Sequence, residues 1–231
     1  MSSGGTTPVL PTVLAVLGKD LLIEIRTREI VTTAGFFAAL VTIMASVAFW
    51  GGETTTKVIG PGAIWLPVSF ASVLALSRTW QREREERALT GLLVAPVSRA
   101  AIFGGKAAGV FLFVLAIEAV VVPLVGLMFH VELPEVLPRL LPVLLLGTVG
   151  IASTGTLFGA MTVRTRARDL VLASVLFPLL SPTLVTGVSA TREIFAGYGW
   201  AEIRPHLLLL GVFDVVSLAG GLTLFGALVD D

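Results

Sequence analysis

The sequence predicts an all-α membrane protein in which six transmembrane helices follow an amphipathic interfacial helix. Of its 231 residues, 55% are hydrophobic and only 14% are charged, and the mean hydropathy is +0.94. Because an ordinary soluble domain has about 25% charged residues, this composition excludes that class. Six apolar stretches, each long enough to cross a hydrocarbon core of ~30 Å, lie between the charged residues. Charge and hydropathy therefore agree on a helical membrane protein.

The N-terminal part of the chain does not match a membrane span. Residues 1–11 are small, polar and Pro-containing, which predicts a flexible tail, and they lack the features of a secretory signal peptide. Residues 12–28 predict an amphipathic helix on the membrane surface, since apolar and polar residues separate at helical spacing. The apolar face is Leu14, Leu17, Leu21, Leu22 and Ile25, and the polar face is Lys19, Asp20, Glu24 and Thr27. The alternative is a plain extension of the first span.

The remaining chain predicts six spans, at residues 30–50, 59–77, 101–129, 137–163, 169–189 and 205–229. Helices are expected because backbone polar groups in lipid need partners within their own segment. With connections this short, residues 12–231 form a single transmembrane domain.

The basic residues predict the orientation, because they gather on the cytoplasmic side of a membrane protein. Twelve of the 16 Lys and Arg residues fall before the first span or in alternate connections after it: Lys19, Arg26, Arg28, Arg78, Arg82, Arg84, Arg87, Arg99, Lys106, Arg164, Arg166 and Arg168. The other side has Lys57, Arg139, Arg192 and Arg204. We therefore expect both termini in the cytoplasm.

Residues 80–96 are the most informative segment. The first half is almost entirely charged, the second half is apolar, and Pro96 ends it. Arg82 and Glu86 are four residues apart, which supports a helix. A solvated connector is the usual meaning of such a charge run, but its apolar half favours a short cytoplasmic helix that docks into a partner protein. The docking residues are Gln81, Arg82, Glu83, Arg84, Glu85, Glu86, Leu89, Leu92 and Leu93.

These motifs together resemble the CcmB family, the permease subunit of the ABC-type haem exporter of cytochrome c maturation. The resemblance is densest over residues 59–109. It rests on Ile59-Gly-Pro-Gly-Ala-Ile-Trp65, Arg78, the Glu-Arg-Glu cluster, Leu92-Leu93-Val-Ala-Pro96, Ala101-Ile102 and Gly105-Lys106. Lys19-Asp-Leu with Glu24 and Arg26, and Val171 to Thr183, are also similar to the family. At Arg87-Ala88-Leu89-Thr90 the chain departs from the family pattern.

The resemblance implies an ABC exporter permease of the inner membrane, with Gln81 to Glu86 against a separate CcmA-like ATPase. It also implies CcmC-like and CcmD-like membrane partners and permits a second copy of the chain. Haem is then a transported or handled ligand, and ATP binds the partner chain. The charged helix is shared by permeases for lipid, polysaccharide or drug export, which stay open as alternatives. So does a membrane scaffold or ion-coupled carrier without an ATPase.

The residues themselves argue against chemistry within this chain. The pair Gly105-Lys106 precedes Ala107 and so lacks the hydroxyl of a phosphate loop. There is no cysteine, and no His and carboxylate cluster has metal-ligand spacing. The formal net charge of zero gives no reason to expect nucleic-acid binding. We therefore expect a subunit without catalytic residues, metal or firmly bound cofactor.

Four polar residues are candidates for function in or near the membrane. Glu118 and Asp214 lie deep in apolar segments, where a lone charge costs ~2.5 kcal/mol or more. Each is a neutral acid bonded to a neighbouring helix, a polar lining of a translocation path or a contact to a partner subunit. His130 and His206 are both expected near the outer surface, as interfacial residues or as contacts to haem iron.

Small residues and prolines predict where helices pack and bend. Gly105 with Gly109 and Gly155 with Gly159 form Gly-x-x-x-Gly pairs, which permit a close approach of helices. Pro178 and Pro182 remove two backbone donors from the fifth span, so we expect this span to be kinked or broken.

Overall fold

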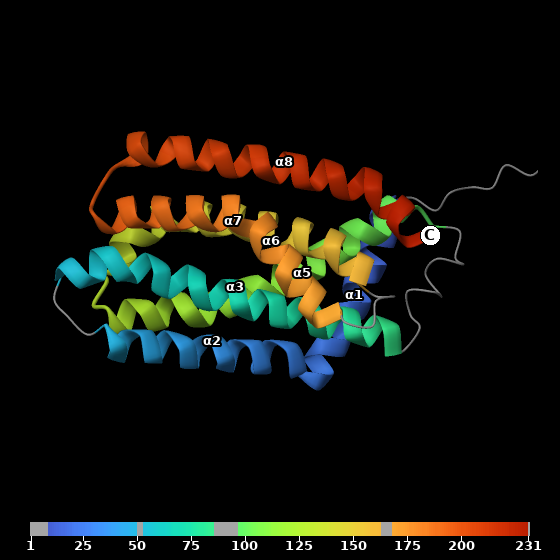
Figure 1. Ribbon diagram of the computed structural model, residues 1–231, viewed down its shortest axis with the longest axis horizontal. Coiled ribbons are helices and arrows are strands. Elements are labelled where there is room, and N and C mark those ends of the chain that lie inside the picture. Colours follow the sequence, from blue (N-terminus) through green and yellow to red (C-terminus); the bar gives the residue numbers. More distant parts are fainter. Residues whose placement is uncertain (1–8, 50–52, 86–96, 163–167, 231) are drawn as a thin grey trace, which may run out of the picture.

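The computed structural model describes residues 9–49, 53–85, 97–162 and 168–230. Over these residues the chain forms seven helices and no strand. The helices are α1 (Val9–Thr27), α2 (Glu29–Ala48), α3 (Glu53–Glu85), α5 (Arg99–Met128), α6 (Leu133–Thr162), α7 (Arg168–Phe195) and α8 (Trp200–Asp230). The long helices run side by side, with α2 and α8 at opposite edges of the bundle and α1 at one end (Figure 1).

Six of these helices are long and apolar enough to cross a membrane, which confirms the predicted number of spans. The apolar portions are Glu29–Ala48, Thr56–Glu83, Arg99–Met128, Leu133–Met161, Ser174–Phe195 and Trp200–Leu228. Several helices are longer than predicted, α3 most of all, because their polar ends continue in helical conformation beyond the apolar core.

The predicted helix over residues 12–28 is present as α1, and one residue separates it from α2. Arg28 has left-handed backbone angles (φ 53°, ψ 18°), which turn the chain sharply between the two helices. The Glu24 carboxylate accepts a hydrogen bond from the Val31 backbone N–H at 2.9 Å. It thereby satisfies one of the backbone N–H groups that have no partner within the first turn of α2.

Local backbone and side-chain features also explain where the other helices begin and how the chain turns between them. Ser98 caps α5 by accepting a hydrogen bond from the Ala101 N–H at 3.2 Å. His130, with a φ of 55°, turns the chain from α5 to α6, and Gly197, with a φ of 88°, turns it from α7 to α8. These tight turns make α5 and α6, and α7 and α8, neighbouring antiparallel pairs.

The centre of the bundle is the contact of α3 with glycines of α6 and α7. The Trp65 ring lies where Gly147 and Gly187 have no side chain, and the Trp65 Nε1 donates to Thr191 Oγ1 at 2.9 Å. Further along α3, Leu76 faces Gly155 and Trp80 faces Gly159. Gly155 and Gly159 thus admit large side chains of α3. Such packing matters because lipid is as apolar as these side chains, and close van der Waals contact must hold the helices together.

The predicted Gly-x-x-x-Gly pair of α5 faces α1. A side chain on Gly105 would lie 2.7 Å from Val16 Cβ and 3.0 Å from the Val13 carbonyl oxygen. A side chain on Gly109 would lie 3.6 Å from Asp20 Oδ2. Without side chains at these positions, α1 can lie directly against α5.

Pro178 and Pro182 do not break the fifth span. Both lie inside α7, which is continuous from Arg168 to Phe195, and its ribbon changes direction along the bundle (Figure 1). The Ser181 hydroxyl donates to the Pro178 carbonyl at 2.7 Å, an acceptor that Pro182 cannot use.

Replacing Gly187 with Ala tests the packing of the Trp65 ring against Gly187. The new Cβ would lie 2.6 Å from Trp65 Cζ2, so we expect G187A to lose about 1–3 kcal/mol of unfolding free energy through overpacking. Thermal unfolding in detergent measures it. G211A is the matched control, because nothing lies within 4 Å of that position and Ala favours a helix by up to about 1 kcal/mol. Equal effects of the two changes would contradict the packing described.

Candidate functional site

A buried lysine joins three helices at the end of the bundle where α1 lies. Lys106, near the start of α5, is 1% exposed. Its Nζ lies 2.8 and 3.0 Å from the carboxylate oxygens of Asp20 on α1, and 2.5 Å from Glu83 Oε1 on α3. Asp20 and Glu83 are themselves buried. We call the cluster of Lys19, Asp20, Glu83 and Lys106 the lysine lock.

Lys19 completes this cluster from the solvent side. It is 33% exposed, and its Nζ lies 2.5 Å from Glu83 Oε1 and 3.3 Å from Asp20 Oδ1. Burial alone lowers the pKa of Lys19, but the hydrogen bond and ion pair with Glu83, together with the charge of Asp20, outweigh it and raise the pKa. Lys19 therefore stays charged at neutral pH, and two cations balance two carboxylates.

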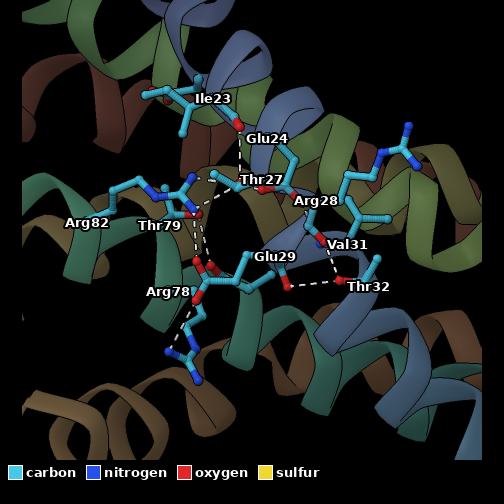
Figure 2. A network of polar contacts seen from close by, with 12 residues as sticks. Ile23, Glu24, Thr27, Arg28, Glu29, Val31, Thr32, Arg78, Thr79 and Arg82 are labelled. Atoms are coloured by element: carbon cyan, nitrogen blue, oxygen red, sulfur yellow. Dashed lines mark hydrogen bonds and ion pairs between the residues drawn. The ribbon is translucent and has the colours of Figure 1, made fainter.

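A second network ties the α1–α2 turn to α3. Figure 2 shows Arg78 and Arg82 of α3 extending toward Glu29 at the start of α2. Arg82 Nη2 lies 3.2 Å from Glu29 Oε2, and Arg78 Nη1 lies 3.5 Å from Glu29 Oε1. Arg82 also donates to Thr27 Oγ1 at 3.3 Å and lies 3.9 Å from Glu24 Oε2. We call this group, together with the lysine lock, the charged end of the bundle.

The polar face of α1 points into the protein. Asp20 and Glu24 are buried, whereas Leu14, Leu22 and Ile25 are exposed on the surface of the subunit. The helical spacing predicted the two faces, but the polar face meets charges of α3 and α5 instead of water. The outward apolar face fits the predicted position against the membrane, which stays a prediction.

The predicted docking segment divides into two parts. Residues 80–85 are the last turns of α3 and do not begin a separate helix, which corrects the predicted start at residue 80. Glu83 is 4% exposed, and its Oε1 accepts hydrogen bonds from Lys19 and Lys106, so this carboxylate also has partners within the subunit. Arg82 belongs to the second network. Gln81 is half-buried. Arg84 and Glu85 are the last residues of α3, and the structure describes their backbone only. Glu86, Leu89, Leu92 and Leu93 lie outside the described residues.

The intramembrane acids lie apart from the charged end. Glu118 on α5 is 3% exposed and accepts a hydrogen bond from Thr148 of α6 at 2.8 Å. Asp214 on α8 is 4% exposed, and neither of its carboxyl oxygens has a hydrogen-bond partner. Because neither Asp214 oxygen has a hydrogen-bond partner, the two acids do not form a hydrogen-bonded carboxylate pair.

The two histidines occupy different settings. His130 is exposed in the α5–α6 turn. His206 on α8 has its Nδ1 3.4 Å from Glu193 Oε2 at the end of α7. Among the described residues, no three His or carboxylate side chains gather as a metal site would require.

Sequence reasoning missed the role of Lys106. In the sequence it is one of the basic residues that predict orientation, yet more than ten residues without a charge follow it. A lone cation in an apolar span needs an anionic partner. That rule would have pointed to the carboxylates of residues 12–28 and 80–86, though not to Asp20 and Glu83 in particular.

Comparisons with known proteins cover nearly the whole chain. A family described as "CcmB protein" matches residues 11–227. The chain is 30% identical to heme exporter protein B of Paracoccus denitrificans, over 84% of this chain and 91% of that protein. It is 29% identical to heme exporter protein B of Rhodobacter capsulatus, over 86% and 89% of the two chains. For the protein of the same name from Pseudomonas aeruginosa, the identity is 26% over 84% of each chain.

Removing the buried ammonium tests the lysine lock. We expect K106M to lose about 3–5 kcal/mol of unfolding free energy, because Asp20 and Glu83 would keep buried charges without their main partner. Thermal unfolding in detergent measures the loss.

Two further variants control this prediction. R78M removes an ion pair whose side chains are 43% and 49% exposed, so its cost should be about 0–1 kcal/mol. The triple variant D20N/E83Q/K106M removes the unpaired charges and should regain most of the K106M loss. Equal losses in K106M and R78M would contradict the lock.

Proposed function

The chain belongs to the CcmB family, and from this we propose that it is the membrane-spanning permease subunit of an ABC transporter that exports or delivers haem for c-type cytochrome maturation. The observation that carries the proposal is the family match over residues 11–227, supported by six helices of membrane-spanning length. The proposal that haem is the transported ligand comes from the relatives, which are named heme exporter protein B.

ATP hydrolysis belongs to a separate, CcmA-like subunit in this proposal. The Gly105-Lys106 pair does not have the sequence of a phosphate loop. The geometry adds a second reason: a phosphate-binding lysine must reach its nucleotide, whereas the Lys106 ammonium is buried between Asp20 and Glu83. The chain thus needs a motor from another polypeptide.

Through the charged end, movements of the ATPase subunit would be transmitted to the membrane-spanning helices. Helix α3 crosses the bundle and ends at Glu85, directly before residues 86–96, which we propose as the docking segment. A pull on this segment acts on α3 itself. It reaches α1 and α5 through the lysine lock, and α2 through Arg82 and Glu29. Four helices would therefore respond together.

The remaining assignments follow the family and the sequence. The complex would lie in the inner membrane with both termini in the cytoplasm, beside CcmC-like and CcmD-like subunits and a possible second copy of the chain. In that orientation the charged end faces the cytoplasm. His130 and His206 stay candidates for contact with haem.

Deletion and complementation test the haem assignment. A strain lacking this chain should lose haem-stained c-type cytochromes, and plasmid expression of the wild-type chain should restore them. A strain that keeps normal cytochromes would overturn haem export and favour a permease for lipid, polysaccharide or drug.

The docking segment has its own test. We expect L92A/L93A to reduce co-purification of the ATPase subunit by roughly 30-fold, as loss of a buried apolar anchor does at other interfaces. E135Q, near the opposite end of the bundle at the start of α6, is the control and should keep the complex intact. Full co-purification of L92A/L93A would show that the partner does not grip these leucines.

A further inference from the structure

Helices α6, α7 and α8 enclose an acid and a hydroxyl that have no partners. Asp214 on α8 is 4% exposed, and both of its carboxyl oxygens are buried without a hydrogen bond. Thr183 on α7 is 0% exposed, and its hydroxyl also lacks a hydrogen bond. Both lie in helices long and apolar enough to span the membrane.

A glycine makes room for these two groups. A side chain on Gly150 of α6 would place its Cβ 2.8 Å from Thr183 Oγ1 and 3.0 Å from Asp214 Oδ1. The two oxygens therefore border the same small space, beside the backbone of α6. A carboxyl and a hydroxyl beside a glycine backbone are groups that can share a proton.

The Thr183 hydroxyl differs from most of its counterparts in the bundle. Buried hydroxyls here usually donate to the carbonyl four residues earlier, as Thr42 does to Ala38 and Thr191 does to Gly187, each at 2.8 Å. Thr183 makes no such bond, so both its proton and its lone pairs are available to Asp214.

The nearby ionisable groups do not neutralise an Asp214 carboxylate. Along the helices around it, the nearest are Glu118 on α5, Arg139 on α6, Arg192 on α7 and His206 on α8. The last three are each at least eight residues, or about 12 Å of helix, from Gly150, Thr183 and Asp214 respectively. Glu118 is an acid and contacts Thr148. Among the described residues, no cation lies within ion-pair distance of Asp214.

An isolated carboxylate in such a setting is unstable, because desolvation in lipid strongly disfavours the charge. A neutral carboxylic acid avoids this penalty and gains an O–H donor for which Thr183 Oγ1 is an acceptor. We propose that Asp214 and Thr183 form a proton-binding site within the membrane, at which Asp214 holds an exchangeable proton while α6, α7 and α8 are packed together. The site does not depend on what the permease transports.

The proposal makes the packing of these helices sensitive to pH. An aspartate in the unfolded chain ionises near a pKa of about 3.9, whereas the packed state requires the neutral form. Stability is therefore greatest at low pH and falls as the pH rises above that value. Separation of α8 from α6 and α7 would let water reach Asp214 and release the proton.

Infrared spectroscopy of the chain reconstituted in lipid nanodiscs tests the protonation state directly. At neutral pH in choline chloride, the wild-type minus D214N difference spectrum should show a carboxylic acid C=O band. E118Q is the matched control, since it replaces the other buried acid and should remove a separate band. A carboxylate band in the D214N difference would overturn the proposal. So would replacement of the acid band by a carboxylate band when sodium replaces choline, which would indicate a cation site.

The wild-type minus T183V difference spectrum keeps the test decisive if D214N does not fold, and thermal unfolding adds a second measurement if it does. T183V removes the acceptor for the Asp214 proton and should shift the same acid band to higher frequency; an unchanged band would contradict the pairing. Where D214N does fold, its melting temperature should rise relative to that of the wild type as the pH increases from about 5 to about 9. A constant difference across this range would also refute the site.

Discussion

The burial of the Lys106 ammonium constrains how the helices of this protein meet. An ammonium without water is stable only when anionic groups surround it. Its two carboxylates come from different helices, Asp20 from α1 and Glu83 from α3. Movement of either helix away from α5 would separate the buried Lys106 ammonium from one of its two carboxylates. Helix α1, which is not among the six helices long and apolar enough to cross a membrane, is thereby fixed to two helices that are.

Within the membrane the helices are held by shape instead of charge. The large side chains of α3 enter spaces left by glycines, Trp65 at Gly147 and Gly187 and Trp80 at Gly159. Because α3 also carries Arg82 and Glu83 at its end, one helix takes part in both kinds of contact. Helices α2 and α8, at the two edges, present apolar outer faces that suit contact with lipid. α3 is therefore the element through which the charged end and the membrane interior are joined.

The sequence was sufficient for the helices and insufficient for the contacts between them. Hydropathy identified the six spans, because crossing lipid imposes a strong signal on about 20 consecutive residues. Helical spacing also identified the two faces of α1. Spacing cannot tell which way a face points, however, so Asp20 and Glu24 were assigned to the outside of a surface helix although they pair inward. Glu83 was assigned to docking for the same reason: a charge run is typical of a solvated face, and its buried partner Lys106 lies 23 residues away. Pro178 and Pro182 predicted a kink or a break in the fifth span, and of the two the break is absent, because α7 is continuous from Arg168 to Phe195.

The charged end and the Asp214 site differ in whether their buried carboxylates have basic partners, and they therefore respond to different influences. At the charged end, every buried carboxylate described has a basic partner, so its geometry resists displacement. Asp214 has none, so the packing around it depends on a proton. The two regions are connected through α6, whose Gly147 receives Trp65 of α3 and whose Gly150 borders Asp214 one turn further along. A displacement of α3 must either withdraw Trp65 from α6 or carry α6 with it. In the second case the movement reaches the space beside Gly150, and a pull at the charged end would alter how firmly Asp214 holds its proton.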